Sequence, residues 1–144
     1  VSFMNFSKTT EYALRILSFM AMDEEKLYKA NDIYKSLHIP YRYLRKQLTI
    51  LTKSGLLNSV QGKYGGYKIS KKLSEISLLD IVNATVDKSI QNDCFFGFEG
   101  CAVVEKCAMH DKWAVIQKNI NNVLKSTNLA ELKETGPHSF ISNK

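Results

Sequence analysis

The sequence predicts a mostly α-helical fold, in which a winged helix-turn-helix domain with a small β-hairpin wing is followed by a long dimerisation helix. Two helical segments early in the chain meet at a proline, and a glycine-rich hairpin follows them. Residues 29–72 hold these motifs and carry ten Lys and Arg against one acid, a charge of +9, while the other residues sum to −3. Such a basic module is typical of a nucleic-acid-binding unit, although a solvated lysine-rich surface would give the same count.

The first two helices are expected from apolar periodicity and from their end signals. Ser7 is a favourable N-cap, and the apolar residues after it recur at helical spacing, which predicts a helix over about residues 8–22. A second, shorter helix is expected over residues 29–37. Pro40 lacks an N–H donor and restricts Ile39, so it ends the second helix and suits the opening of a third.

The third helix is expected to have one apolar face and one polar, basic face. Leu44, Leu48 and Leu51 share the apolar face, and Ser54-Gly55 gives a C-cap signal. The second helix of a helix-turn-helix enters the major groove, so the polar face would contact DNA. That face carries Tyr41, Arg42, Tyr43, Arg45, Lys46 and Gln47, of which Arg42, Tyr43, Arg45 and Lys46 are predicted to bind DNA.

A β-hairpin wing is expected directly after this helix. Residues 56–60 and 66–69 are strand-like runs, and the tip between them is rich in glycine. Lys63 and Tyr64 at the tip are the predicted wing contacts, because a lysine there can reach a phosphate or a narrow minor groove. The glycines do not form a nucleotide-binding loop, since the P-loop spacing and the helix that must follow it are missing.

A fourth helix and a long fifth helix complete the expected elements. Ser77 to Asp80 resembles a capping box and opens a helix that extends to about residue 87. A long helix follows from residue 111. Its apolar residues are spaced three, four and three apart, a narrow seam that suits packing against another helix, or equally within its own domain. The seam residues are Trp113, Ile116, Ile120 and Val123.

The chain is therefore expected to divide into four parts. A winged domain covers residues 1–88, a cysteine-rich segment 89–110, a dimerisation helix 111–134, and a disordered tail 135–144.

All three cysteines lie in one segment together with a histidine. Cys94, Cys101, Cys107 and His110 are separated by six, five and two residues. Thiolates and an imidazole this close can enclose a metal centre, whereas buried structural cysteines would be scattered. Zinc uses the same ligands, but its sites usually contain a Cys pair about two to four residues apart. The spacing favours an iron–sulfur cluster with two or four irons; zinc or redox-active cysteines are the alternative.

Several function classes are disfavoured by the sequence. Three cysteines cannot all pair within one chain, and no signal peptide is recognised, so a cytoplasmic protein with reduced thiols is expected. The sequence contains no run of about 18 apolar residues, so no membrane span is expected. No Ser–His–acid set, phosphate loop or suggestive carboxylate pair is found, so the chain is not expected to be an enzyme.

Together these motifs resemble the Rrf2 family of bacterial winged-helix transcription regulators, which includes IscR-like and NsrR-like members. The resemblance covers about residues 4–132. It rests on the opening MNFSKTTEYALRIL, the wing QGKYGGYKISKK, the segment ISLLDIVNATVD and the three cysteines. It implies a homodimer, paired through the long helix, that binds a palindromic DNA operator. The function it implies is that of a repressor whose DNA binding is controlled by a cluster sensing redox state, nitric oxide or iron–sulfur status.

The resemblance also implies the ligands of the cluster. Cys94, Cys101 and Cys107 match the three cluster cysteines of the family. The fourth ligand would be His110, as in IscR-like members, or Glu11 in the first helix, reaching across from the partner subunit as in NsrR-like members. His110 is preferred because it is local and softer. The first cysteine gap is one residue longer than the IscR-like pattern, which leaves the cluster type open, and some members use a cysteine directly as a sensor.

Overall fold

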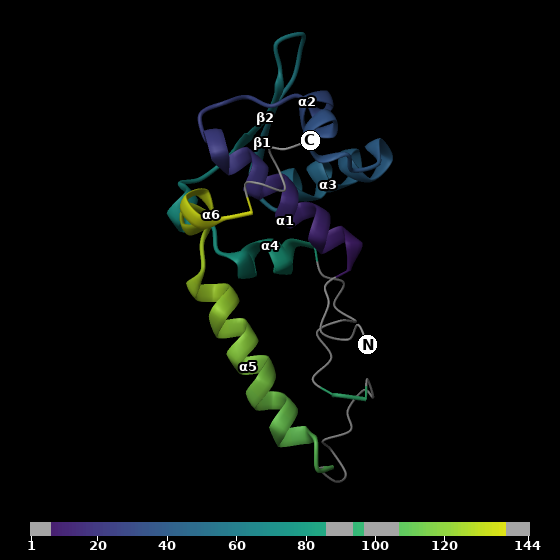
Figure 1. Ribbon diagram of the computed structural model, residues 1–144. Coiled ribbons are helices and arrows are strands. Elements are labelled where there is room, and N and C mark those ends of the chain that lie inside the picture. The colour runs from purple at the N-terminus through teal and green to yellow at the C-terminus, as the bar shows by residue number, and fades with distance from the viewer. Residues whose placement is uncertain (1–6, 86–93, 97–106, 138–144) are drawn as a thin grey trace.

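The protein is represented by a computed structural model, which describes residues 7–85, 94–96 and 107–137. The chain forms a helical head from which a two-stranded hairpin projects at one end and a long helix at the other (Figure 1). This is the mostly helical, winged architecture that the sequence predicts. In chain order the elements are α1 (Lys8–Met20), η1 (Ala21–Asp23), α2 (Ala30–Leu37), α3 (Tyr41–Lys53), β1 (Leu57–Val60), β2 (Gly66–Ile69), η2 (Leu73–Glu75), α4 (Leu78–Thr85), α5 (His110–Ser126) and α6 (Leu129–Thr135).

The core of the head is built from the apolar faces of the first three helices. Ser7 caps α1 by accepting a hydrogen bond from the Thr10 N–H at 3.4 Å. Ile16 and Leu17 of α1 and Leu48 of α3 are fully buried. Burying a side chain of this size contributes about 1.5–3 kcal/mol, so this shared core holds α3 against α1.

The turn between α2 and α3 is fixed by three local features. His38 adopts a left-handed conformation (φ 53°) and donates its N–H to the Tyr34 carbonyl at 3.0 Å. Ile39 is 1% exposed and anchors the turn in the core. Pro40 then opens α3, and its carbonyl accepts the Leu44 N–H at 3.0 Å. The proline signal in the sequence therefore marks the helix boundary correctly.

The wing is tied to the head by a backbone bridge that the sequence did not indicate. β1 and β2 are antiparallel, with Leu57 opposite Ile69. Tyr28 exchanges two backbone hydrogen bonds with Tyr67 of β2, at 2.8 and 2.7 Å. A Cβ on Gly66 would lie 2.5 Å from the Tyr28 carbonyl oxygen, so this close approach requires glycine. The bridge fixes the base of the wing relative to α1 and α2.

The helix predicted over residues 111–134 ends earlier, at Ser126, and this part of the prediction is wrong. Asn128 accepts a hydrogen bond from the Glu131 N–H at 3.1 Å, and the Glu131 carboxylate accepts the Asn128 N–H at 2.8 Å. This capping box starts a separate helix, α6. Leu129 is fully buried in the core of the head. Residues 129–135 therefore pack with the head, while α5 alone projects from it as a stalk (Figure 1).

The stalk is joined to the head by main-chain hydrogen bonds. The Leu78 N–H donates to the Thr127 carbonyl at 2.9 Å, and the Leu129 N–H donates to the Ile76 carbonyl at 3.0 Å. Ser77 and Asn128 pair as an isolated β-bridge between them. Each of these two residues also caps a helix, so α4 and α6 start side by side.

Some predictions fall on residues outside the described ranges. These are the extension of α4 to residue 87, most of the cysteine segment including Cys101, and the tail beyond residue 137. None of the helices that the structure describes combines the length and the apolar character needed to cross a bilayer.

Candidate nucleic-acid interface and metal centre

The outward face of α3 carries the four predicted contact residues of this helix. Arg42, Tyr43, Arg45 and Lys46 are all exposed, and Tyr43 retains 53% of its accessible surface. α3 contains no acidic residue, so this face is uniformly basic and aromatic. A helix of this kind, held by its apolar face, suits the major groove of DNA.

Gln47 was expected on this outer face and lies in the core instead. It is 1% exposed, and its Oε1 has no hydrogen-bond partner among the residues described. Its neighbours at helical spacing, Leu44, Leu48 and Leu51, are buried too. Leu44, Gln47, Leu48 and Leu51 are spaced three, one and three residues apart, which places Gln47 inside the apolar stripe. The prediction that Gln47 is exposed, made from its polarity, is therefore wrong.

Two tyrosines order the exposed face of α3. Tyr41 stands one helical turn before Arg45, and its hydroxyl, by hydrogen bonding, raises the pKa of the Arg45 guanidinium. The Tyr34 ring of α2 packs edge-on against the Tyr41 ring, with centroids 5.6 Å apart. Tyr41 therefore contacts α2 through its ring and carries the hydrogen-bond partner of the Arg45 guanidinium. Tyr41 was expected on this face, but no role was predicted for it from the sequence.

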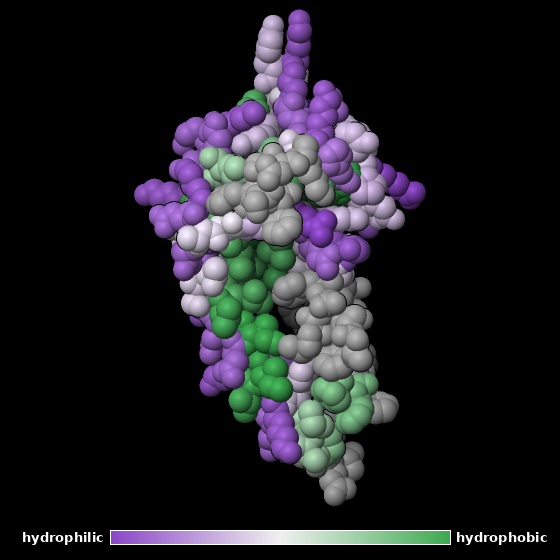
Figure 2. Space-filling model, viewed as in Figure 1, coloured by the Kyte–Doolittle hydropathy of each residue, from purple (hydrophilic) through white to green (hydrophobic). Residues whose placement is uncertain are grey.

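The wing tip presents the other two predicted contacts. Tyr64 is 81% exposed, and the Lys63 ammonium lies 5.5 Å from the centroid of its ring. Gly62 has a φ of 103°, a conformation that a side chain would strain. The wing and α3 lie at the end of the molecule away from the stalk (Figure 1). Figure 2 shows hydrophilic residues covering most of this end.

The first turn of α5 contains one predicted metal ligand and lies close to another. His110 opens the helix, and its N–H donates to the Cys107 carbonyl at 3.1 Å. The His110 Nδ1 is buried and has no hydrogen-bond partner in the part of the chain described. Burying an unsatisfied polar atom is costly, and a neutral imidazole nitrogen of this kind can ligate a metal. Cys107 is exposed.

An aromatic contact brings the segment of Cys94 to the same turn. The Phe95 and Trp113 rings pack edge-on, with centroids 5.4 Å apart. Cys94 precedes Phe95, and Trp113 lies one turn after His110, so both candidate ligands flank this contact. Trp113 was expected in the helix seam, and no role was expected for Phe95. Cysteine sulfurs and an imidazole nitrogen are ligand types that suit a transition metal, and the chain brings Cys94, Cys107 and His110 to this region.

Of the other ligand candidates, only Glu11 lies in the part of the chain that the structure describes, and it is not in this turn. Within residues 7–85, 94–96 and 107–137 no three metal-binding side chains come together, and Cys101 lies outside these ranges. Glu11 is in the first turn of α1 and pairs with the Lys8 ammonium at 3.1 Å. α1 belongs to the head, whereas His110 is at the free end of the stalk (Figure 1). Glu11 and His110 of one chain are therefore far apart.

The stalk helix has an apolar face that the described residues leave partly exposed. Val123 and Ile116 of the predicted seam are 61% and 40% exposed, and Val115 beside them is 58% exposed. No residue of α5 is fully buried. Figure 2 shows the hydrophobic strip that runs along this helix. The seam therefore does not serve as ordinary core packing within the described chain.

A helix-turn-helix, a wing and a basic recognition face define a winged-helix DNA-binding transcription regulator. The profile of the Rrf2 family, described as iron-dependent transcriptional regulators, matches residues 6–135, and the chain belongs to this family. The chain is 32% identical to protein aau3 of Rhizobium meliloti over 93% of its length and 88% of that protein. It is also 32% identical to the regulator IscR of Serratia proteamaculans, over 90% of its length and 79% of that protein.

Two solved structures share the fold. CymR, the global cysteine regulator of B. subtilis, superposes with a TM-score of 0.76 at 24% identity, over 91% of this chain and 97% of that one. IscR of T. potens has the same TM-score at 20% identity, over 94% and 90% of the two chains. The predicted winged-helix architecture is therefore confirmed.

Proposed function

We propose that this regulator binds a two-fold symmetric operator as a homodimer and represses transcription, and that a metal centre at the start of α5 controls its DNA affinity. Family membership supplies the coarser statement, a DNA-binding transcription regulator. The observation that carries the finer one is the buried Nδ1 of His110, which has no hydrogen-bond partner among the residues described, in a helical turn that is joined by a backbone hydrogen bond to Cys107 and by a ring contact to Phe95, the neighbour of Cys94.

The DNA contacts would come from two elements. Arg42 and Arg45 have the fork geometry that pairs with the O6 and N7 acceptors of guanine in the major groove. Tyr43 and Lys46 would add contacts to base edges and phosphates from the same face. Lys63 and Tyr64 on the wing would contact the phosphate backbone or the adjacent minor groove, which adds affinity without much sequence preference.

The homodimer would form through the apolar face of α5. Ile116 and Val123 lie on the predicted seam and are exposed in the single chain. A second copy would remove this surface from water, and a two-fold axis would set the separation of the two recognition helices. Half-site spacing would then depend on the angle between each stalk and its head.

Cys94, Cys101 and Cys107, with His110 or with Glu11 of the partner subunit, would hold an iron–sulfur cluster. When bound, such a cluster supplies a redox-active centre that reacts with oxygen or nitric oxide. His110 is the first residue of α5, so its orientation bears directly on the stalk. The stalk ends at Thr127, whose carbonyl accepts a hydrogen bond from Leu78 at the start of α4. A change in the orientation of His110 would therefore be transmitted to the head through α5 alone.

The alternative is the same regulator with zinc or with a directly redox-active thiol. The exposure of Cys107 favours a reactive thiol, since an accessible sulfur can be oxidised. A related structure is the oxidised form of Staphylococcus aureus CymR, which is 26% identical to this chain over 91% of its length.

The deciding experiment combines a spectrum with a binding measurement. Protein purified without oxygen should show broad visible charge-transfer bands with iron and sulfide in stoichiometric amounts, and Cys101→Ala should lose them. Operator affinity, on a duplex selected from a random-sequence pool, should differ between the loaded wild type and this variant at equal salt. A colourless protein with stoichiometric zinc, or with none and a reactive Cys107, would establish the alternative. Equal affinities would reduce the cluster to a structural role.

A further inference from the structure

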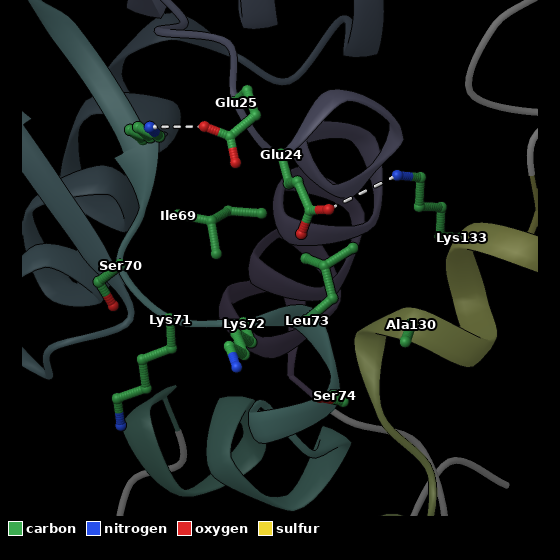
Figure 3. Close-up of a pocket in the computed structure, with 11 residues that line it drawn as sticks. Glu24, Glu25, Ile69, Ser70, Lys71, Lys72, Leu73, Ser74, Ala130 and Lys133 are labelled. Carbon is green, nitrogen blue, oxygen red and sulfur yellow. Dashed lines mark hydrogen bonds and ion pairs between the residues drawn. The ribbon is translucent and has the colours of Figure 1, made fainter.

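A groove on the side of the head away from α3 is lined by lysines from several elements. It lies between β2, η1, η2 and α6 and has a volume of about 630 Å³ (Figure 3). Its basic residues are Lys68, Lys71, Lys72 and Lys133, and its acidic residues are Glu24 and Glu25. Four positive and two negative charges leave a surplus of two positive charges. None of these residues belongs to the DNA-binding set or to the metal ligands.

The two glutamates each neutralise one lysine. The Lys68 ammonium lies 3.1 Å from the Glu25 carboxylate, and the Lys133 ammonium lies 3.8 Å from the Glu24 carboxylate. Figure 3 shows these pairs on two sides of the groove, with Lys71 and Lys72 on the segment between β2 and η2. Lys71 and Lys72 are exposed, and neither has an ion-pair partner among the residues described. The surplus positive charge is thus concentrated on two adjacent side chains.

The floor of the groove is apolar. Ile69 and Leu73 are 6% and 5% exposed, and Ala130 of α6 contributes to the lining. A floor of carbon beside ammonium groups suits a ligand with a short carbon skeleton and several negative charges. Lysine ammonium groups bind carboxylate or phosphate as point charges, without demanding one geometry. The volume is also within the usual range for small-molecule sites.

The position of the groove argues against the operator as its occupant. α6 and α3 lie on opposite sides of the head (Figure 1). A duplex held by α3 and the wing tip would therefore leave the α6 side uncovered. We propose that this groove is a binding site for a small organic anion with two or more negative charges, a carboxylate or a phosphate ester, held chiefly by Lys71 and Lys72.

The experiment uses the full chain, with citrate as a tricarboxylate probe and glycerol 2-phosphate as a phosphate-ester probe. Each is titrated at constant ionic strength, with chloride as the balancing salt, while the melting temperature and the heat of binding are recorded. Saturable binding and a rise in Tm are expected from at least one probe. Lys71→Ser/Lys72→Ser should weaken the apparent affinity about tenfold or more, since it removes the two unpaired charges.

A charge-matched control separates a site from general electrostatics. Lys35→Ser/Lys53→Ser removes two exposed lysines outside the groove and should retain probe binding. The proposal is overturned if neither probe saturates, or if both double variants lose binding equally. It is also overturned if the groove variant loses affinity for duplex DNA while its probe binding is unchanged, because the groove would then be a nucleic-acid surface. Circular dichroism establishes that both variants are folded.

Discussion

The recognition face of α3 and the cysteine segment differ in how much of each site one chain organises by itself. The recognition face is held by covalent and packing constraints within the head: Pro40 sets the start of the helix, and Tyr34 packs against Tyr41. At the start of α5, by contrast, Phe95 packs on Trp113, but the His110 Nδ1 has no partner in the described part of the chain. The α3 face is thus preorganised within one chain, whereas the start of α5 keeps a polar atom that no described residue satisfies.

The largest expected effect would come from disrupting the proposed dimer, which pairs two recognition faces through α5. Ile120→Asp places a charge in the middle of the α5 seam, where a partner subunit would bury it without a counter-ion. Sedimentation should show a monomer, and operator affinity should fall about a hundredfold or more because bivalent binding is lost. A charge on the exposed polar side, Asn121→Asp, is the control and should leave the dimer intact. A dimeric Ile120→Asp would place the dimer interface elsewhere.

The next effect concerns the fourth ligand. If the proposed metal centre forms, His110→Ala should lower its retention about tenfold or more, since the change removes the proposed ligand at the start of α5. The iron content after gel filtration without oxygen is the measurement. Glu11→Gln is the comparison: if it loses the iron and His110→Ala keeps it, the ligand comes from the partner's α1. If both variants retain the iron, neither His110 nor Glu11 is the fourth ligand.

A substitution on the α3 face should change the preference for DNA sequence, and not only the overall affinity for DNA. Arg45→Ala should cost about 1–3 kcal/mol on the operator and relax the preference at one base pair. Lys63→Ala should weaken binding to all duplexes alike and reduce the salt dependence by about one ion. Fluorescence anisotropy on the operator and on a scrambled duplex, at several salt concentrations, separates the two effects. If the two variants behave alike, the assignment of base and backbone contacts is incorrect.

The smallest effect tests whether Tyr41 positions Arg45. Tyr41→Phe keeps the ring that packs on Tyr34 and removes only the hydroxyl, so operator affinity should fall by about 0.5–1.5 kcal/mol. The same change in the Arg45→Ala background should have no further effect, because the group that the hydroxyl orients is gone. Tyr43→Phe, combined with Arg45→Ala in the same way, is the control and should give additive losses. Additive losses for Tyr41 would mean that its hydroxyl contacts DNA independently.

Much of the head could be predicted because its signals are local. Pro40, the apolar spacing of α3 and the glycine-rich tip each act within a few residues, and the elements begin and end close to where these signals fall. The break before α6 was also locally encoded, by Asn128 and Glu131, but the continuing apolar spacing of α5 concealed it. Gln47 shows the reverse case: it was expected on the surface because its side chain is polar, although the apolar residues at helical spacing around it are all buried.

Contacts between distant segments could not be predicted in the same way. The exchange of hydrogen bonds between Tyr28 and Tyr67 and the burial of Leu129 depend on chain segments that meet only after folding. The ring contact of Phe95 with Trp113 is of the same kind. The cysteine spacing identified the residues of the candidate metal centre, but only the three-dimensional arrangement reveals that His110 has a nitrogen available for it.

The attachment of α5 makes the stalk a lever with its fulcrum at the head. α5 has 17 residues, which at 1.5 Å each gives an arm of about 25 Å. A displacement of about 2 Å at His110 then corresponds to a rotation of only about 5° where Thr127 meets Leu78, since the angle is the displacement divided by this arm. Main-chain hydrogen bonds can follow so small a rotation without breaking. In the proposed dimer, a small change at His110 would therefore tilt the recognition helices relative to each other by rotation at the junction of stalk and head.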